Sequence, residues 1–498
     1  MIALALLIAA VAVAAGFWVL NTASKTQTYK RIPGPTGVPF LGNILQLGKQ
    51  MHIQFCKWSK QYGDIYEVKL GTQRAVVISN PKWVKEIFST DTAFSGRSRI
   101  QCFEMYPDTP FALGIVSSEG EFWETHRRFL LRQLRDFGFG KSYMEQLVLE
   151  EVQEVIERFR KTKGKSVSDL KSVFVLAVIN SLWTILTSKR FQHDDPKLNT
   201  LVENLHKVLF DLVETGGMIM FIPWIGRILP EWSGYNKLRK VVEDNRSFLE
   251  EAVKEHKDAF QEHNLRDFID VYLNEMNKTV DTTSPFYGET AEQHLVAALG
   301  DMFGAGTDTT STTLTWGILY IIKFPGVQSK FQQEIDLVTA NSRNVSVNDR
   351  SSMPYTSALI EEILRYSSIV PGGVQHRATE DKVFKGYLIQ KDTWIFPNLY
   401  HIHYNPEIWG DPEAFRPERF LSEDGKVFKK NENLMPFQTG RRQCVGESLA
   451  RDTVFLFLTN IFRTFTIHFD SNAPKPPVDP MGLILSPQPF SVVMNERS

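Results

Sequence analysis

The sequence is poor in cysteine: only Cys56, Cys102 and Cys444 occur in 498 residues. Three thiols cannot build the disulfide framework of a small secreted domain, which favours a reducing compartment. The net charge is also small, at −1 with histidine counted as neutral. Overall charge therefore gives no reason to expect nucleic acid as a partner, and any electrostatic binding surface must be local.

Charged residues are absent from residues 1–20, which are mostly apolar. About twenty helical residues span roughly 30 Å, the thickness of a bilayer's hydrocarbon core. A cleavable signal peptide is the alternative, but no Lys or Arg precedes this run, and the first basic residues are Lys25, Lys30 and Arg31. The positive-inside rule then places the rest of the chain in the cytosol. We expect a single-pass membrane anchor at 1–20, a basic and Pro/Gly-rich linker at 21–40 and one catalytic domain at 41–498.

Hydrophobic residues make up 43% of the chain and aromatic residues 12%, enough for a large packed core. Helical periodicity dominates residues 121–344, including 146–161 and 236–264. Residues 68–79 predict a β-hairpin with Gly71 near its turn. A second apolar stretch, 216–232, is interrupted by Pro223 and is too short to span a bilayer, so it is either a core segment or an interfacial one. The fold class is therefore mainly α with a small β region.

The most informative stretch is FQTGRRQCVG, residues 437–446. A cysteine is a useful metal ligand as the thiolate, which needs positive potential or amide donors nearby. The apolar run 445–465 predicts a helix whose free N–H groups and dipole would stabilise a negative sulfur on Cys444. Gly440 and Gly446 allow tight turns and close approach to a flat cofactor, and Arg442 can neutralise a carboxylate. A lone inert cysteine is the alternative, and it leaves this combination of residues unexplained.

This loop resembles the haem-binding signature of the cytochrome P450 family, Phe-x-x-Gly-x-Arg-x-Cys-x-Gly, at every position from Phe437 to Gly446. The resemblance extends along nearly the whole chain after the first 20 residues. It implies the cytochrome P450 fold and a haem b cofactor, iron protoporphyrin IX, with the thiolate of Cys444 as axial metal ligand.

Other positions match the family in the expected order. Glu362 and Arg365 resemble its Glu-x-x-Arg pair, and their i, i+3 spacing puts them on one helix face. Arg419 in PERF resembles the arginine that joins the pair. By itself such a pair is usually a solvated surface contact of small value. The resemblance instead implies a structural clamp in the core next to the haem.

Further residues match contacts to the haem propionates. Trp123 and Arg127 correspond to the family's Trp-x-x-x-Arg. Arg97 and His376 correspond to propionate contacts in microsomal members, although Gln375 replaces a proline common there. We expect these four residues, together with Arg442, to bind the cofactor.

The segment AGTDTT, residues 305–310, lies in a predicted helix over 291–323. The Thr309 hydroxyl can bond the carbonyl of Ala305, four residues back, and so bend the helix. Gly306 weakens the same turn. A threonine-rich helix face without chemistry is the alternative if the segment stands alone. Together with the cysteine loop it resembles the family's oxygen-activation motif, with Asp308 and Thr309 as the catalytic acid–alcohol pair in an opened helix wall.

Basic side chains recur at i, i+4, i+7 on the helix that carries Trp123: Arg128, Arg132 and Arg135. Most such stripes are merely solvated. The resemblance puts this one on the cysteine side of the haem, where an electron donor docks, and Lys429, Lys430 and Arg441 could extend it. We expect NADPH-cytochrome P450 reductase as the partner, with cytochrome b5 as a further candidate.

The resemblance implies a monooxygenase of the endoplasmic reticulum membrane that uses O2 and a small apolar substrate. The implied substrate pocket draws on residues 101–112, 302–305, 370–374 and 486–490, with Phe103, Phe111, Phe303, Ala305, Val370, Val374 and Phe490. The chain is similar to arthropod members of the microsomal steroid- and drug-hydroxylating group, and methyl farnesoate epoxidases are the favoured specific match.

Several alternatives stay open from the sequence. The substrate could instead be a steroid or ecdysteroid, a fatty acid or a xenobiotic compound. An isomerase or dehydratase with this fold would keep Cys444 but usually lacks the acid–alcohol pair. A non-catalytic haem-binding protein would need neither that pair nor a basic docking face.

Overall fold

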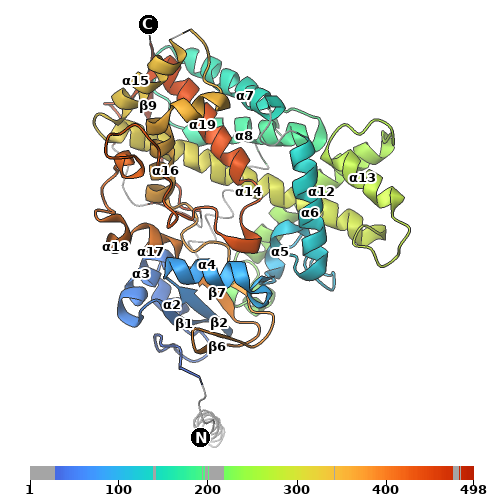
Figure 1. Ribbon diagram of the computed structural model, residues 1–498. Helices are drawn as coiled ribbons and strands as arrows, with labels where there is room; N and C mark the ends of the chain where they lie inside the picture. The colour runs from blue at the N-terminus through green and yellow to red at the C-terminus, as the bar shows by residue number, and fades with distance from the viewer. Residues whose placement is uncertain are drawn as a thin grey trace, which may run out of the picture.

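The computed structural model describes residues 29–497, apart from 138–141, 193–194, 197–199, 201–217, 341, 475–479, 481 and 483. The predicted anchor at 1–20 lies outside the described residues. Within the described part the chain is mainly helical with small sheets, as predicted. The five-stranded sheet lies at the end of the molecule near the N-terminus, and most helices form a larger body at the opposite end (Figure 1).

The largest sheet carries the predicted hairpin and two of the predicted cofactor contacts. Its strand order is β1 (Ile65–Leu70), β2 (Gln73–Ile78), β7 (Trp394–Pro397), β4 (His376–Arg377) and β3 (Gly96–Arg97). β1 and β2 pair antiparallel around Gly71, whose φ is 65°, so the hairpin is confirmed. β2 and β7 are parallel. Between β3 and β4 the register places Arg97 opposite His376. Two-stranded sheets form from β5 (Lys382–Phe384) with β6 (Tyr387–Ile389) and from β8 (Phe465–Phe469) with β9 (Val492–Glu496).

A long central helix, α14 (Gly288–Lys323), runs through the helical body (Figure 1). It confirms the predicted helix and begins three residues earlier than expected. The helices that pack against it include α8 (Leu170–Thr187), α12 (Tyr235–Asp258), α16 (Pro354–Ser367) and α19 (Glu447–Thr464). The remaining α-helices of the described residues are α2 (Ile44–Leu47), α3 (Met51–Tyr62), α4 (Pro81–Thr90), α5 (Gly114–Ser117), α6 (Gly120–Asp136), α7 (Ser142–Arg160), α10 (Met218–Phe221), α11 (Trp224–Ile228), α13 (Phe268–Lys278), α15 (Val327–Thr339), α17 (Leu399–His403) and α18 (Pro406–Trp409).

One helix of the described chain, α8, is long and apolar enough to cross a membrane. Most of its side chains are buried inside the protein, however, and it packs along α14. Its apolar composition is therefore explained by the core, because a helix that is hydrophobic all round is surrounded by other elements.

The second apolar stretch of the sequence divides into a buried part and an exposed part. Ile219, Phe221 and Ile222 are buried, the last two against the sheet. Four large apolar side chains that follow are exposed: Trp224 at 54%, Ile228 at 66%, Leu229 at 49% and Trp232 at 60%. We call these four the apolar patch. The core interpretation is therefore confirmed for the buried part, and the interfacial interpretation stays a prediction for the exposed part.

The apolar patch predicts residual membrane binding after residues 1–20 are removed. The truncated protein should still associate with lipid vesicles, because amphipathic surface segments insert their apolar side chains at the bilayer interface. Replacing Trp224, Ile228 and Trp232 by serine should lower vesicle partitioning at least tenfold, since burial of one such side chain contributes about 1.5–3 kcal/mol. Leu337→Ser, on α15 and 84% exposed, is the matched control. Equal partitioning of the triple variant and the control would exclude the patch from membrane binding.

Candidate functional site

The cysteine loop is built between a short 3-10 turn, Gly440–Arg442, and the start of α19 at Glu447. The Cys444 N–H donates to the carbonyl of Phe437 at 3.0 Å. Gly440 has φ of +80°, and a Cβ there would lie 2.0 Å from the Phe88 carbonyl oxygen of α4. The positive φ and the approach to α4 both require glycine, which agrees with the tight turn expected at Gly440. The φ of Gly446 is −93° and a Cβ there would only touch the Cys444 sulfur at 3.9 Å, so the protein alone does not require glycine there.

The Cys444 thiol is exposed to solvent, unlike that of Cys102, which is buried. The surrounding protein nevertheless desolvates the sulfur and raises the pKa of Cys444, while the Gly446 amide and the Arg127 charge act in the opposite direction. Burial raises the pKa of both Cys56 and Cys102 to about 12. A cation bound at the Cys444 sulfur would supply the positive charge that favours the thiolate. Cys444 is therefore the most accessible candidate ligand among the three cysteines, and its role as a metal ligand stays a prediction.

The predicted cofactor residues converge beside this loop, and we call them the cationic cradle: Arg97, Trp123, Arg127, His376 and Arg442. The Arg442 guanidinium lies 3.6 Å from the Trp123 ring and donates to the carbonyls of Ser95 and Ser118 at 2.9 and 2.8 Å. Arg97 donates to the carbonyls of Val374 and Gln375, both at 2.9 Å. Arg127 donates to the Gln443 carbonyl at 2.5 Å. All of these acceptors are neutral carbonyls, so these hydrogen bonds do not neutralise the three guanidinium charges.

The electrostatics of the cationic cradle favour an anion. Burial, together with the charge of Arg127, lowers the pKa of Arg97 to about 9. Burial and then the charges of Arg97 and Arg127 lower the pKa of Arg442 to about 8. Like charges held together out of water are costly, and a bound carboxylate would reverse that cost.

Unpartnered polar atoms show where such an anion fits. In the described part of the chain, Arg97 Nε, Trp123 Nε1, His376 Nε2 and Arg442 Nη1 are buried and have no hydrogen-bond partner. Each buried unsatisfied group costs about 1–3 kcal/mol, so four in one place need an explanation. Burial holds the pKa of His376 well below its usual value, and its Nδ1–H donates to the Phe94 carbonyl. An adjacent carboxylate would raise that pKa and make Nε2 a donor. The donor set therefore fits the carboxylates of haem.

The predicted hydrogen bond in α14 is confirmed: the Thr309 hydroxyl donates to the Ala305 carbonyl at 2.7 Å. Ala305 is exposed, and a Cβ at Gly304 would meet no atom within 4 Å, so this turn of the helix faces open space. The expected opening of the helix wall is not observed, because α14 is one continuous helix through the motif. The hydrogen bond from Thr309 to the Ala305 carbonyl therefore does not interrupt the helix.

The predicted pocket residues differ in exposure. Phe303 is buried against Trp183 and Phe248, whereas Gly304 and Ala305 lie on the open side of α14, and the place of Phe303 in the pocket stays a prediction. Phe490 is likewise buried, with its ring against Phe469. The aromatic pattern in the sequence could not distinguish buried rings from exposed ones. The other predicted pocket residues are at least partly exposed, namely Phe103, Phe111, Val370 and Val374.

Two α14 side chains that the sequence did not single out hold α5 in place. Asp301 accepts the amides of Ile115 and Val116 at 2.6 and 2.8 Å, and the His294 ring accepts the Gly114 amide at 3.2 Å. Burial raises the pKa of Asp301 to about 6, although these two amides act against the shift. A Cβ at Gly114 would lie 2.4 Å from the Asp301 carboxylate, so only glycine fits. No sequence motif marks this contact.

The Glu362–Arg365 pair is fully buried and has the clamp geometry that the resemblance implies. Arg365 donates twice to the Glu362 carboxylate, both at 2.8 Å, and once to the His403 carbonyl at 2.8 Å. Arg419 reaches the same carboxylate at 3.1 Å and the Trp409 carbonyl at 2.8 Å. One ion pair thus fixes α16 to two segments that follow it in sequence. Breaking a buried pair costs about 3–5 kcal/mol, because the remaining charge is stranded.

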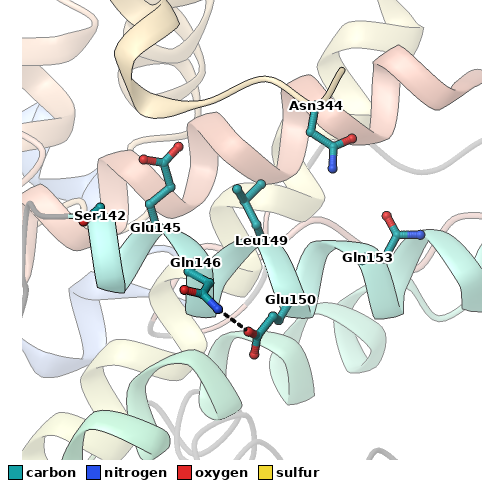
Figure 2. Close-up of a pocket in the computed structure, with 7 residues that line it drawn as sticks. All are labelled: Ser142, Glu145, Gln146, Leu149, Glu150, Gln153 and Asn344. Carbon is teal, nitrogen blue, oxygen red and sulfur yellow. Dashed lines mark hydrogen bonds between the residues drawn. The ribbon is translucent and has the colours of Figure 1, made fainter. Parts of the chain in front are cut away.

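A surface hollow and a cluster of titratable residues lie outside the predicted site. A hollow of about 440 Å³ lies between α7 and Asn344. None of its lining residues, drawn in Figure 2, belongs to the predicted site. His256, Asp267 and Asp270 lie close enough to hold a metal ion. However, the His256 ring donates to the Ala252 carbonyl and to Asp267, so both ring nitrogens are engaged. That cluster caps α13 through Asp267, which accepts the Asp270 amide.

Comparisons with known proteins agree with this geometry. The family model described as cytochrome P450 matches residues 32–494. Cytochrome P450 2C20 of Macaca fascicularis is 38% identical over 444 residues, covering 87% of each chain. Cytochrome P450 18a1 of Drosophila melanogaster is 34% identical over 482 residues, 93% of this chain and 87% of the relative. Farnesoate epoxidase of Bombyx mori is 32% identical over 481 residues, 93% of this chain and 94% of the relative.

Proposed function

This chain belongs to the cytochrome P450 family of haem-thiolate monooxygenases, and on that premise we propose that it oxygenates a small, uncharged lipophilic substrate, with methyl farnesoate as the specific candidate. The observation that carries the oxygenase proposal is the pairing of the cysteine loop with the Thr309 turn of α14. Isomerases, dehydratases and haem carriers need the first of these features but not the second.

We assign the haem contacts as follows. The Cys444 thiolate would hold the haem iron, and the cationic cradle would hold the propionates through Arg97, Trp123, Arg127, Arg442 and, once protonated, His376. When bound, the haem supplies the dioxygen chemistry, in which two electrons from NADPH allow one oxygen atom to enter the substrate while the other leaves as water. The buried arginines fix the cofactor's orientation, because their donors already point into one region and little reordering is needed.

The protein's own contribution to this chemistry is proton delivery, since the reduction of dioxygen to water consumes protons. Thr309 is the proposed hydroxyl at the open face of α14, where it holds a proton or an ordered water. Its present bond to the Ala305 carbonyl is worth about 0.5–1.5 kcal/mol net, so the hydroxyl can turn outward at small cost. Asp308, the next residue, is the proposed carboxylate that resupplies the proton.

Two observations support an uncharged apolar substrate. The open turn of α14 presents Gly304 and Ala305, which offer no charge or hydrogen-bonding side chain. The arginines nearest the site are the ones whose free donors we assign to the haem, which leaves no assigned cation for a substrate carboxylate. A farnesoate ester is apolar and uncharged, and a relative of nearly equal length is named for epoxidation of farnesoate. Steroid, fatty-acid and xenobiotic oxidation are the competing specificities.

The test is a spectral binding screen of the purified haem protein with methyl farnesoate, farnesoic acid, ecdysteroids and lauric acid. It is followed by turnover with NADPH and its reductase. We expect methyl farnesoate to give the tightest binding and an epoxide product, with the free acid bound at least tenfold more weakly, because burying an unpaired carboxylate is costly. A preference for a steroid or a fatty acid would replace the specific candidate. Tight binding without NADPH consumption would instead favour an isomerase or a haem carrier.

A redox partner is expected at the cysteine side of the molecule, and we place the enzyme at the endoplasmic reticulum membrane with NADPH-cytochrome P450 reductase. Arg128, Arg132 and Arg135 are exposed on α6, and within the described chain they form no ion pair. α6 contacts the cysteine loop through Arg127 and through an ion pair of Glu124 with Arg441 at 2.7 Å. Part of the Arg441 charge is therefore already compensated, and the three α6 arginines with the exposed Lys429 and Lys430 are the proposed docking charges.

Reversing Arg128, Arg132 and Arg135 to glutamate should raise the reductase concentration needed for half-maximal turnover at least tenfold at low salt. Complementary charges speed association, and screening by salt should narrow the difference between variant and wild type. Lys161, Lys163 and Lys165, exposed at the end of α7, provide a control reversal of the same total charge. Substrate binding should stay unchanged in both variants. If both variants needed the same reductase concentration for half-maximal turnover, the three α6 arginines would have no specific role in docking.

A further inference from the structure

One polar side chain on the buried face of α12 has no hydrogen-bond partner for its oxygen. The buried residues of this helix recur at helical spacing, and all of them are apolar except Asn245 and His256. His256 uses both of its ring nitrogens. Asn245 is 8% exposed, and among the described residues no group donates to its buried Oδ1. The Asn245 amide is therefore the unsatisfied group on this face.

Contacts between α12 and α14 show which part of α14 this face meets. Lys257 Nζ of α12 lies 2.9 Å from Glu292 Oε2 of α14. Two turns earlier on α12, a methyl carbon of Leu249 lies 3.2 Å from the place that a Cβ on Gly300 would take, two turns later on α14. A step back along α12 thus corresponds to an equal step forward along α14. The two helices are antiparallel neighbours over this stretch.

The same register leads from Leu249 to the open turn of α14. Phe248 of α12 packs against Phe303, with ring centroids 6.2 Å apart. Asn245 lies one turn before Leu249 on the same face, because residues four apart are neighbours on a helix surface. Its counterpart one turn further along α14 is Gly304. A Cβ at Gly304 would meet no atom within 4 Å, so the amide is directed to the space that we propose for the substrate.

The facing turn of α14 does not satisfy this amide. Residues 302–306 read Met-Phe-Gly-Ala-Gly and carry no polar side chain, and their backbone N–H groups lie within a continuous helix. A buried polar atom without a partner is costly, so native proteins leave few of them. A water molecule is a poor substitute, because it needs about two to four polar partners of its own. A ligand that brings its own polar atom fits these observations.

We propose that Asn245 is a specificity-determining residue that hydrogen-bonds the carbonyl oxygen of a neutral ester in the substrate. A half-turn of the amide exchanges its oxygen and its NH2 group, so the NH2 group can donate to that carbonyl. The amide has no charge and cannot neutralise a carboxylate, so the ester is preferred to the free acid. The inference rests on the proposed oxygenase function and adds one polar anchor to an otherwise apolar wall.

This anchor also decides which end of a chain-like substrate is oxidised. Thr309, the proposed site of proton delivery, lies five residues after Gly304, which is about 7.5 Å along the axis of α14. An ester held at Asn245 therefore stays away from the Thr309 turn, and the hydrocarbon chain extends toward it. We expect oxidation at a double bond remote from the ester.

The experiment compares two ligands of the purified full-length haem protein in spectral titrations. Methyl farnesoate carries the ester, and farnesene is a hydrocarbon of the same isoprenoid class without it. In Asn245→Leu, which keeps the size of the side chain and removes its polar atoms, the Kd of the ester should rise about tenfold, the scale of one hydrogen bond. The Kd of farnesene should change less than twofold. Turnover of the ester by the variant should give products oxidised at more than one double bond.

Asn274→Leu is the matched control. Asn274 Oδ1 is also buried without a partner, but it belongs to α13 and not to the helices that face the open turn. The control should keep the Kd of both ligands. Without ligand, Asn245→Leu should have the Tm of wild type or a higher one, because replacing an unsatisfied polar group by an apolar one of the same shape removes a cost. If leucine prevents purification, Asn245→Ala is titrated in the same way.

The outcomes separate this inference from the proposed function. If the two Kd values change by the same factor in Asn245→Leu, or if wild type binds the ester no better than Asn245→Leu does, the role of Asn245 is overturned. A ligand-free Tm that falls in Asn245→Leu but not in Asn274→Leu would also overturn it, because the amide would then serve the fold. If wild type forms no product from any substrate, the proposed function fails, and the ratio of the two Kd values still decides whether Asn245 binds the ester.

Discussion

Cys444→Ser should abolish the thiolate-type absorption band of the reduced carbon monoxide complex and all monooxygenase turnover. A serine hydroxyl stays protonated at neutral pH and is a hard, weak donor, whereas a thiolate is a soft ligand that donates electron density to iron. The structure strengthens the assignment, because Cys444 is the one cysteine of the three that combines solvent exposure with a neighbouring arginine and amide. The absorption spectrum of the purified variant is the measurement.

Cys56→Ser is the matched control. Cys56 is half-buried in α3, and burial raises its pKa to about 12, so it cannot serve as a thiolate near neutral pH. The control should keep the full absorption band. A band that survives in Cys444→Ser, or disappears in Cys56→Ser, would show that the ligand has been assigned to the wrong sulfur.

Thr309→Ala should lower product formation about 10²-fold, equivalent to about 2.7 kcal/mol of transition-state stabilisation. Haem binding and substrate affinity should hardly change, because the hydroxyl contributes to neither. Protons should then arrive too slowly, so that reduced oxygen leaves more often as hydrogen peroxide and NADPH consumption per product rises. Product, peroxide and NADPH are measured together in one reaction.

Thr313→Ala separates the chemical role of Thr309 from a structural one. The Thr313 hydroxyl makes the same kind of bond one turn later, to the Thr309 carbonyl at 2.8 Å, but it is buried at 3% exposure. Loss of that bond should affect stability at most and leave coupling unchanged. Similar coupling in the two alanine variants would remove Thr309 from the proton route and strengthen the alternatives without oxygenation.

Local sequence patterns were enough to predict the main helices, the hairpin and the order of the motifs. The hairpin around Gly71, the long helix through AGTDTT and the loop before α19 all depend on residues close in the chain, whose spacing and turn chemistry can be read directly. The Thr309 bond to Ala305 was predictable for the same reason, since both atoms belong to one helical turn. The resemblance to a known family then supplied the expected roles.

The sequence could not predict which side chains meet across elements. Phe303 and Phe490 are predicted pocket residues, and the sequence did not show that their rings pack against Trp183 and Phe469. Periodicity indicates which face of a helix or strand is apolar. It does not show which side chains from other elements will surround a given residue. The contacts of Asp301 with α5 were missed because no pattern joins residues so distant in the chain.

The sequence by itself therefore determined the cofactor family and the mainly helical fold and predicted Cys444 as the ligand, because each depends on residue types at short, fixed spacing. Only the tertiary structure decided that four polar atoms in the cationic cradle remain without partners, that the apolar patch faces outward and that the Asn245 oxygen is buried. Burial, charge compensation and hydrogen-bond satisfaction are properties of the surroundings of a side chain. Those surroundings come from segments hundreds of residues apart, and folding alone brings them together.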